Sequence, residues 1–171
     1  LHTLHQAGYH TVLAGLQHLH GDRTHLGYDQ IIAPTHSTHV ADVVPAAVAF
    51  LQQPPSQPFF LDVGFTETHR DFPRTDPAEA RYIRPPAPLP DTPTTRQDMA
   101  DYISMARELD RGVGVLLDVL AATGLAANTL IVQTTDHGLA FPAMKCNLTD
   151  HGIGVLLIMR GPNGFEGGRV C

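Results

Sequence analysis

An acid and an imidazole stand next to each other at Asp136-His137, directly after the uncharged residues 128–134, which are dominated by β-branched and aliphatic types. A carboxylate oxygen suits Ca²⁺ or Mg²⁺, and an adjacent imidazole suits Zn²⁺ or Mn²⁺ better, so the pair is a candidate corner of a divalent-metal site. Two ligands do not complete such a site, and no other acid of the chain is an obvious candidate for a third. The structural alternative is an Asp that caps a turn before Gly138.

Three further side chains could place positive charge around a bound anion: His18, His69 and Lys145. Cations and hydrogen-bond donors stabilise the charge that moves onto a leaving oxygen when a tetrahedral oxyanion is transferred. Together with a metal corner, they indicate hydrolysis of a sulfate or phosphate ester. The chain shows no nucleophile for this reaction, because neither Cys146 nor Cys171 is placed with a base partner.

Four stretches predict strands. They are residues 11–16, 59–65, 128–134 and 154–160. The first, third and fourth of them along the chain are expected to be buried, and the third is expected to be buried on both faces. Apolar spacing predicts helices over residues 41–52 and from about residue 92 to residue 122. The alternation predicts an α/β fold with a mostly parallel sheet and helices on both faces. Ligands bind beyond the carboxyl ends of such strands, where His18, His69 and Asp136-His137 would lie.

Charge and composition limit the partners of the chain. It has 171 residues, a net charge of -6 with His neutral and no cluster of Lys or Arg, which indicates that it does not bind nucleic acid. No apolar run approaches the roughly 18 residues that a membrane span requires. Residues 72–95 and 139–152 are expected to be loops. Because the chain starts at Leu1 within a helical pattern, we expect an internal fragment of one domain. The sequence does not indicate an oligomeric state.

Several consecutive motifs resemble the signatures of one family. They are Gly8-Tyr9-His10-Thr11 with Gly15-Leu16-Gln17-His18; Phe59-Phe60-Leu61 through Phe65 to His69-Arg70; Tyr102 with Leu109-Asp110-Arg111-Gly112-Val113-Gly114; Asn128-Thr129-Leu130-Ile131-Val132 through Asp136-His137-Gly138; and Lys145 with Leu156-Leu157-Ile158-Met159-Arg160. In this order they are similar to the formylglycine-dependent sulfatases of the alkaline-phosphatase-like superfamily, and most similar to the heparan N-sulfatase (sulfamidase) branch. Residues 1–171 are therefore expected to form an internal fragment of a sulfatase catalytic domain.

The resemblance implies a role for each candidate residue. Asp136 matches a metal-binding Asp, and His137 matches the neighbouring ligand, which is Asn or His in the family. Lys145 matches the cation that contacts the sulfate group, and His69 matches the histidine that can protonate the leaving group. His18 matches the histidine of the family's Gly-Lys-x-His motif.

Two residues depart from the family pattern. Leu16 stands where the Gly-Lys-x-His motif has its lysine, which removes one sulfate-binding cation, and His137 replaces the commoner Asn. The resemblance also implies a divalent cation, with Ca²⁺ ahead of Mg²⁺, Mn²⁺ and Zn²⁺. It further implies a formylglycine nucleophile, whose Cys-x-Pro-Ser-Arg motif is expected upstream of Leu1, and a periplasmic, extracellular or lysosomal protein.

Three functions fit these residues. The first is hydrolysis of a sulfuric ester or sulfamate on a sulfated sugar such as a glycosaminoglycan, by a formylglycine supplied from outside the chain, so that the fragment alone is expected to be inactive. The second is a metal-dependent phosphatase or phosphodiesterase of the same superfamily, in which histidine also occurs at the position of His137. The third is a non-catalytic homologue, for which Leu16 is the only hint.

Overall fold

The computed structural model describes residues 1–32, 37–162 and 167–168, and Cys171 lies outside the described residues. The chain forms two compact units. The first comprises Leu1–Glu67 and Arg107–Thr123, and the second comprises Thr68–Ala106 and Gly124–Cys171. None of the helices in the described part of the chain is both long and apolar enough to cross a bilayer.

A three-stranded parallel sheet forms the centre of the first unit. Its strands are β1 (His10–Gly15), β2 (Gln30–Ile32) and β3 (Phe59–Gly64), in the order β2-β1-β3. In the register, Val12 of β1 lies opposite Gln30 on one side and Leu61 on the other. Residues 11–14 of β1 are fully buried. A run of β-branched and aliphatic residues at the middle of a parallel sheet is expected to be buried in this way, so the predicted strand is confirmed.

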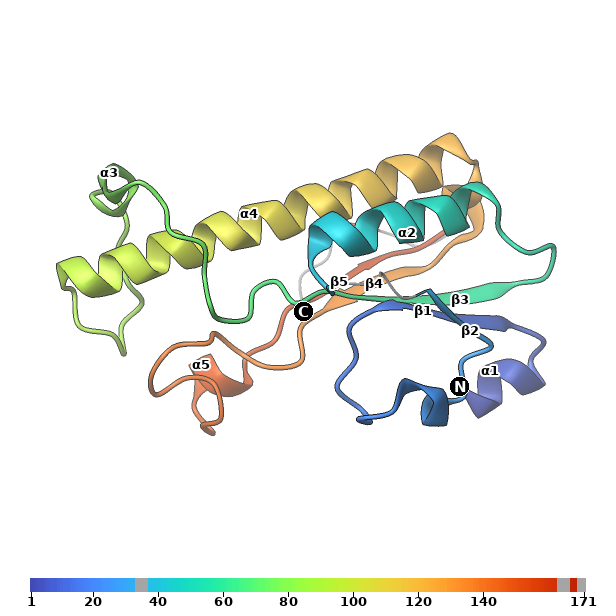
Figure 1. Cartoon of the computed structure of the whole chain (residues 1–171), viewed down its shortest axis with the longest axis horizontal. Coiled ribbons are helices and arrows are strands. Elements are labelled where there is room, and N and C mark those ends of the chain that lie inside the picture. Colours follow the sequence, from blue (N-terminus) through green and yellow to red (C-terminus); the bar gives the residue numbers. More distant parts are fainter. Residues whose placement is uncertain (33–36, 163–166, 169–171) are drawn as a thin grey trace. The chain divides into compact units, whose positions relative to one another are not determined.

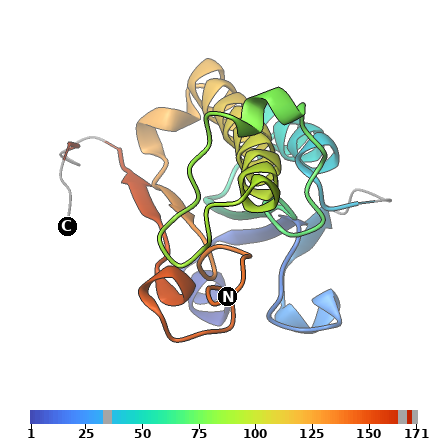
Figure 2. The ribbon, with the colours of Figure 1, turned by 90° about the vertical axis from the view of Figure 1, so that its left-hand side faces the viewer.

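Helices lie on both faces of this sheet, as the sequence predicts. α2 (Val40–Gln52) contacts β1 and β3, and α1 (His2–Gln6) contacts β1. In two views a quarter turn apart, α2 lies on one side of the sheet and α1 lies with η1 (Arg23–Leu26) on the other (Figure 1 and Figure 2). Val43 and Ala47 of α2 are fully buried in a cluster with Ala14 of β1. The predicted α/β class is therefore confirmed.

The second unit contains less regular structure. Its elements are α3 (Pro77–Ala80), the first part of α4 (Pro93–Ala122), η2 (Leu125–Asn128), β4 (Ile131–Thr134), α5 (Asp150–Ile153) and β5 (Leu157–Arg160). Its buried core comprises Leu89, Met99, Phe141 and Met144. The loops predicted over residues 72–95 and 139–152 are present, each interrupted by one helix of 4 residues, α3 or α5. This core fixes the segment after β4 to α4.

The prediction that the last two strands are buried is wrong. β4 and β5 pair antiparallel, and Val132 and Ile158 are 52% and 57% exposed. β4 also begins later than predicted, because Leu125–Asn128 forms a 3-10 helix. Within the described residues, each strand has only the other as a hydrogen-bonded neighbour. A two-stranded ribbon lacks the strands and helices that cover an aliphatic strand inside a larger sheet.

Candidate functional site

Asp136 and His137 follow the end of β4 at Thr134. Nε2 of His137 lies 3.5 Å from Oδ1 of Asp136, and Nδ1 of His137 lies 2.8 Å from the carbonyl oxygen of Gly138. Because a carbonyl oxygen can only accept, Nδ1 carries a proton, and Nε2 is the atom that faces the carboxylate. The contact is attractive when Nε2 is also protonated or when both atoms bind one cation.

This pair can supply two ligands to a divalent cation. The Asp136 side chain is 70% exposed and the His137 side chain is 35% exposed, so both are accessible to an ion. Within residues 1–32, 37–162 and 167–168, no group of three or more His, Cys, Asp or Glu side chains is placed to hold a metal ion. The described residues therefore fit one corner of a metal site, and a cation bound there would need further ligands.

The turn after the pair is closed by backbone contacts. The N–H of Gly138 donates to the Gly152 carbonyl over 2.9 Å, and a Cβ at residue 138 would lie 1.8 Å from the His151 carbonyl oxygen. Only glycine allows two backbone segments to approach so closely. Lys145, the one lysine in the sequence, is half-buried further along this segment, and its N–H donates to the Leu139 carbonyl over 3.0 Å.

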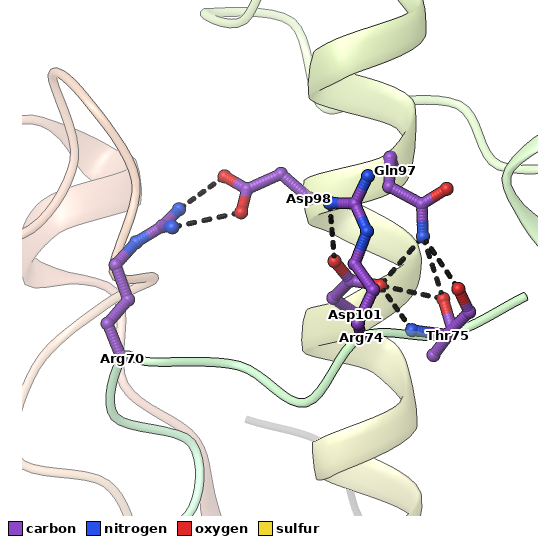
Figure 3. A network of polar contacts seen from close by, with 6 residues as sticks. All are labelled: Arg70, Arg74, Thr75, Gln97, Asp98 and Asp101. Carbon is purple, nitrogen blue, oxygen red and sulfur yellow. Dashed lines mark hydrogen bonds and ion pairs between the residues drawn. The ribbon is translucent and has the colours of Figure 1, made fainter. Parts of the chain in front are cut away.

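His69 is exposed, and its ring is oriented by the next residue. Nδ1 of His69 lies 2.6 Å from the Arg70 carbonyl oxygen, which places the proton on Nδ1 and leaves Nε2 to exchange a proton with a substrate. The Arg70 side chain binds Asp98 and the Ala140 carbonyl, and not the His69 ring. Its Nη1 donates to Oδ1 of Asp98 over 2.9 Å, and its Nη2 pairs with Oδ2 (Figure 3). Its Nε donates to the Ala140 carbonyl over 2.9 Å. The pKa of Arg70 is raised, mainly by the hydrogen bond to Asp98.

A second carboxylate of α4, Asp101, holds the same loop at Thr75. Oδ1 of Asp101 accepts from the Thr75 N–H, the Thr75 hydroxyl and the Gln97 amide over 2.8, 2.7 and 2.8 Å, and Nη1 of Arg74 lies 3.4 Å from Oδ2 (Figure 3). Asp101 is only 4% exposed. Burial by itself raises the pKa of Asp101, but the bonds from Thr75 and Gln97 and the charge of Arg74 outweigh it. The pKa therefore lies below its ordinary value.

The structure places the predicted site residues in two groups. His69, Asp136, His137 and Lys145 lie on two loops of the second unit. Arg70 joins these loops by its bond to Ala140. His18 is exposed beyond the end of β1 and belongs to the first unit. Within the described residues, only Asp136 and His137 of this set share a polar contact. The predicted role of each residue stays a prediction.

Arg70, Asp98 and Asp101 are the residues of this region that the sequence pattern did not single out. In the sequence, Arg70 stands out only as part of the His69-Arg70 motif. The two acids lie among the polar positions of the helix predicted from about residue 92 to residue 122. Their spacing of three places Asp98 and Asp101 on one helical face, which is a usable signal. Such a pair on a helix surface is usually solvated, so the spacing alone does not predict a contact with a distant loop.

Solved structures identify the class of fold. The C-terminal periplasmic domain of EcEptC from Escherichia coli, in complex with Zn, superimposes on this chain with a TM-score of 0.69 at 19% identity. The match covers 95% of this chain and 51% of that one. The chain therefore shares the fold of that domain, which agrees with the predicted α/β class.

Sequence comparisons identify the family. The family model described as Sulfatase matches residues 1–169, so the chain belongs to the sulfatase family. The N-sulphoglucosamine sulphohydrolase of Homo sapiens is 26% identical over 190 aligned residues, which cover 93% of this chain and 38% of that protein. The ulvan-active sulfatase of Formosa agariphila is 36% identical over 81 residues, which cover 47% of this chain and 14% of that protein. The predicted sulfatase family is confirmed, and the similarity to N-sulphoglucosamine sulphohydrolase agrees with the predicted resemblance to the sulfamidase branch. The chain spans well under half the length of both relatives.

Proposed function

We propose that this chain is part of the catalytic domain of a sulfatase that removes sulfate from a sulfated sugar. The match to the sulfatase family over residues 1–169 carries the proposal. Because the chain spans 38% of the human relative, the proposed enzyme is a longer protein that contains residues 1–171. We expect the chain alone to be inactive. Hydrolysis of a sulfuric ester is the general reaction, and cleavage of a sulfamate is the form that the human relative's name supports.

His69 and Lys145 act on the substrate in this proposal. Lys145 would bind the sulfate oxygens, because an ammonium group offsets the negative charge of the anion and of the transition state. His69 would donate a proton from Nε2 to the leaving oxygen or nitrogen, because its Nδ1 is held by the Arg70 carbonyl. His18 would add a further donor to the anion.

Asp136 and His137 would hold a divalent cation together with ligands from outside the described residues. Ca²⁺ is preferred for the carboxylate oxygen, and Mg²⁺, Mn²⁺ and Zn²⁺ are the other candidates. When bound, the cation would offset the charge of the sulfate, and a formylglycine from outside this chain would supply the nucleophile. The contact of 3.5 Å between the carboxylate oxygen and the imidazole nitrogen supports a shared ion.

A sulfated carbohydrate is the proposed substrate class. Two relatives support it by name, one for N-sulphoglucosamine and one for ulvan. The loop that precedes α4 also exposes Arg81, Tyr82 and Arg84, and Tyr82 is 83% exposed. Guanidinium groups bind anionic oxygens, and an exposed aromatic ring offers a flat apolar face. A glycosaminoglycan would present both sulfate groups and sugar rings to this loop.

A metal-dependent phosphatase or phosphodiesterase is the second candidate. His137 favours it, because an imidazole beside a carboxylate suits Zn²⁺. The similar domain from Escherichia coli was solved in complex with Zn. The two candidates share the fold and the metal corner, and they differ in the anion that is hydrolysed.

The test is an assay of the full-length protein on N-sulphoglucosamine, nitrophenyl sulfate and nitrophenyl phosphate, with release of sulfate and phosphate measured. Asp136→Asn and Lys145→Ala should each lower kcat/KM by about 100-fold, the usual effect of losing one charge-stabilising group. Asp118→Asn is the matched control, because this acid is exposed on α4. Turnover of the phosphate ester alone would establish the second candidate. No turnover by a folded protein supplied with Ca²⁺ or Zn²⁺ would leave a non-catalytic homologue.

A further inference from the structure

Three segments of the second unit meet at the side chain of Arg70. The guanidinium binds both oxygens of Asp98 on α4 and the carbonyl of Ala140 on the segment after β4. Its central carbon lies 4.4 Å from the centroid of the Phe72 ring and 5.0 Å from that of Phe141. The two rings are neighbours of each other, with centroids 5.8 Å apart. A planar cation packed against both of them, with its edge bound to acceptors, has little freedom to rotate.

The bond to Ala140 restrains the segment that carries Lys145. Ala140 lies between Asp136 and Lys145 in the sequence, and its neighbour Leu139 accepts the Lys145 N–H over 3.0 Å. Phe141, on the other side of Ala140, is only 4% exposed. A displacement of the Ala140 carbonyl would therefore move the backbone from which the Lys145 side chain projects.

The same arginine restrains His69 through its main chain. In the described part of the chain, the His69 ring has one hydrogen-bond partner, the Arg70 carbonyl oxygen at 2.6 Å. The ring is otherwise exposed. Its orientation therefore depends on the backbone of Arg70, whose side chain is fixed to α4 and to the segment after β4.

We propose that Arg70 is a positioning residue, which holds the loop bearing His69 against the loop bearing Lys145 through its contacts with Asp98 and Ala140. The inference rests on the proposed sulfatase function for the chemistry of these two loops. Nε, Nη1 and Nη2 of Arg70 all face protein acceptors, so the guanidinium acts through its neighbours and not on the sulfate. Lysine cannot replace it fully, because an ammonium group cannot bind both carboxylate oxygens and a carbonyl in one plane.

Arg96 provides a matched control within the same unit. Its Nε and Nη2 bind both oxygens of Asp91, and its Nη1 donates to the Arg81 carbonyl over 3.2 Å. The side chains of Arg70 and Arg96 are 38% and 36% exposed. The two arginines therefore make the same kinds of hydrogen bond, but Arg96 holds the backbone of Arg81 and not that of a residue proposed for catalysis.

The experiment compares Arg70→Gln, Arg70→Lys, Asp98→Asn, the double variant Arg70→Gln/Asp98→Asn and Arg96→Gln in the full-length protein. We expect Arg70→Gln and Asp98→Asn to lower kcat for sulfate release by about 10- to 100-fold with KM little changed, because misplaced groups slow the reaction more than they weaken binding. The double variant should be no worse than Arg70→Gln, since Arg70→Gln already removes the contact with Asp98. Arg70→Lys should be intermediate. Arg96→Gln should keep the wild-type kcat, because Arg96 holds the loop of Arg81 and, among the described residues, bonds to neither the loop of His69 nor that of Lys145.

Amide hydrogen exchange adds a readout that does not depend on turnover. Arg70→Gln should speed exchange in residues 68–75 and 139–145 and leave β1 unchanged, whereas Arg96→Gln should affect only the residues around Asp91 and Arg81. An unchanged kcat in Arg70→Gln, an effect of Arg70→Gln on KM alone, or an equal loss of kcat in Arg96→Gln would overturn the inference. If the wild type releases no sulfate, the proposed function fails. Unchanged exchange at 139–145 in Arg70→Gln would then refute the positioning role separately.

Discussion

Replacement of Asp101 tests how the loop before α4 is attached to that helix. Three donors converge on Oδ1 of Asp101: the N–H and hydroxyl of Thr75 and the amide of Gln97. Among the residues that the structure describes, Oδ2 has only Arg74 as a partner, at 3.4 Å, and the Arg74 side chain is 74% exposed. The two oxygens therefore contribute unequally, and Asp101→Asn and Asp101→Ala should have different effects.

The magnitudes follow from which bonds each variant keeps. Asp101→Asn can place its carbonyl oxygen where Oδ1 lies, so the three bonds remain but lose their charge. A hydrogen bond to a charged group contributes about 1.5–3 kcal/mol and a neutral one about 0.5–1.5 kcal/mol, so we expect a loss of about 2 kcal/mol in the free energy of unfolding. Asp101→Ala removes all three bonds and leaves the Thr75 N–H without its acceptor. The expected loss is about 3–4 kcal/mol.

The effect of Asp101→Asn should also depend on pH. The folded protein lowers the pKa of Asp101, so the ionised carboxylate contributes stability above the unfolded pKa of about 4. That contribution is lost as the pH falls through the folded pKa, and Asn cannot titrate. The difference in unfolding free energy between the wild type and Asp101→Asn should be constant near neutral pH and should shrink below about pH 4.

Urea unfolding of the purified protein, followed by the helical circular dichroism signal, measures these differences. The chain contains no Trp, so intrinsic fluorescence is a poor probe. Asp91→Asn is the control, because it removes an exposed ion pair to Arg96 and should leave stability within error at every pH. Equal losses in Asp101→Asn and Asp101→Ala would refute the assignment of three bonds to one oxygen. A difference from the wild type that does not change with pH would refute the lowered pKa.

Three glycine and core substitutions test the packing around the candidate site and along α4. Met144→Ala removes a fully buried side chain and should lower the free energy of unfolding by about 2–5 kcal/mol in urea. Gly138→Ala should lower the thermal midpoint, because its Cβ would lie 1.8 Å from the His151 carbonyl oxygen, and a midpoint equal to the wild type would contradict that packing. Gly114→Ala meets no atom within 4 Å and should stabilise α4 by about 0.5–1 kcal/mol, so a loss of stability there would be a contrary result.

The elements that could be predicted are those with a local signal. The β-branched run of residues 11–14 and the apolar spacing along α4 act within a few residues, and both elements formed close to their predicted bounds. Burial of β4 and β5 is not local, because it depends on what packs against each strand. Within the described residues each strand has one hydrogen-bonded neighbour, so the aliphatic run of residues 131–134 predicted a strand but not its exposure.

The candidate site was predictable only where its residues are adjacent in the sequence. Asp136 and His137 stand out because two polar side chains directly follow an uncharged strand. The contact of Arg70 with Asp98 joins positions 28 apart through side chains alone, and no periodicity or turn signal reports such a contact. The same limit applies to His18, whose relation to the other four residues depends on tertiary structure and not on local pattern.

Contacts with helix α4 hold the long segment that precedes it, which has little secondary structure and bears His69. Asp98 and Asp101 are three positions apart and therefore lie on one helical face, where they bind Arg70 and Thr75 of the preceding segment. Met99, between them in the sequence, is buried in the core of the unit. One helical stretch thus supplies both core packing and polar anchors. The segment can therefore hold His69 in place with few strand or helix hydrogen bonds of its own. Substitution of Asp98 or Asp101 should for this reason alter the candidate site, although neither residue is part of it.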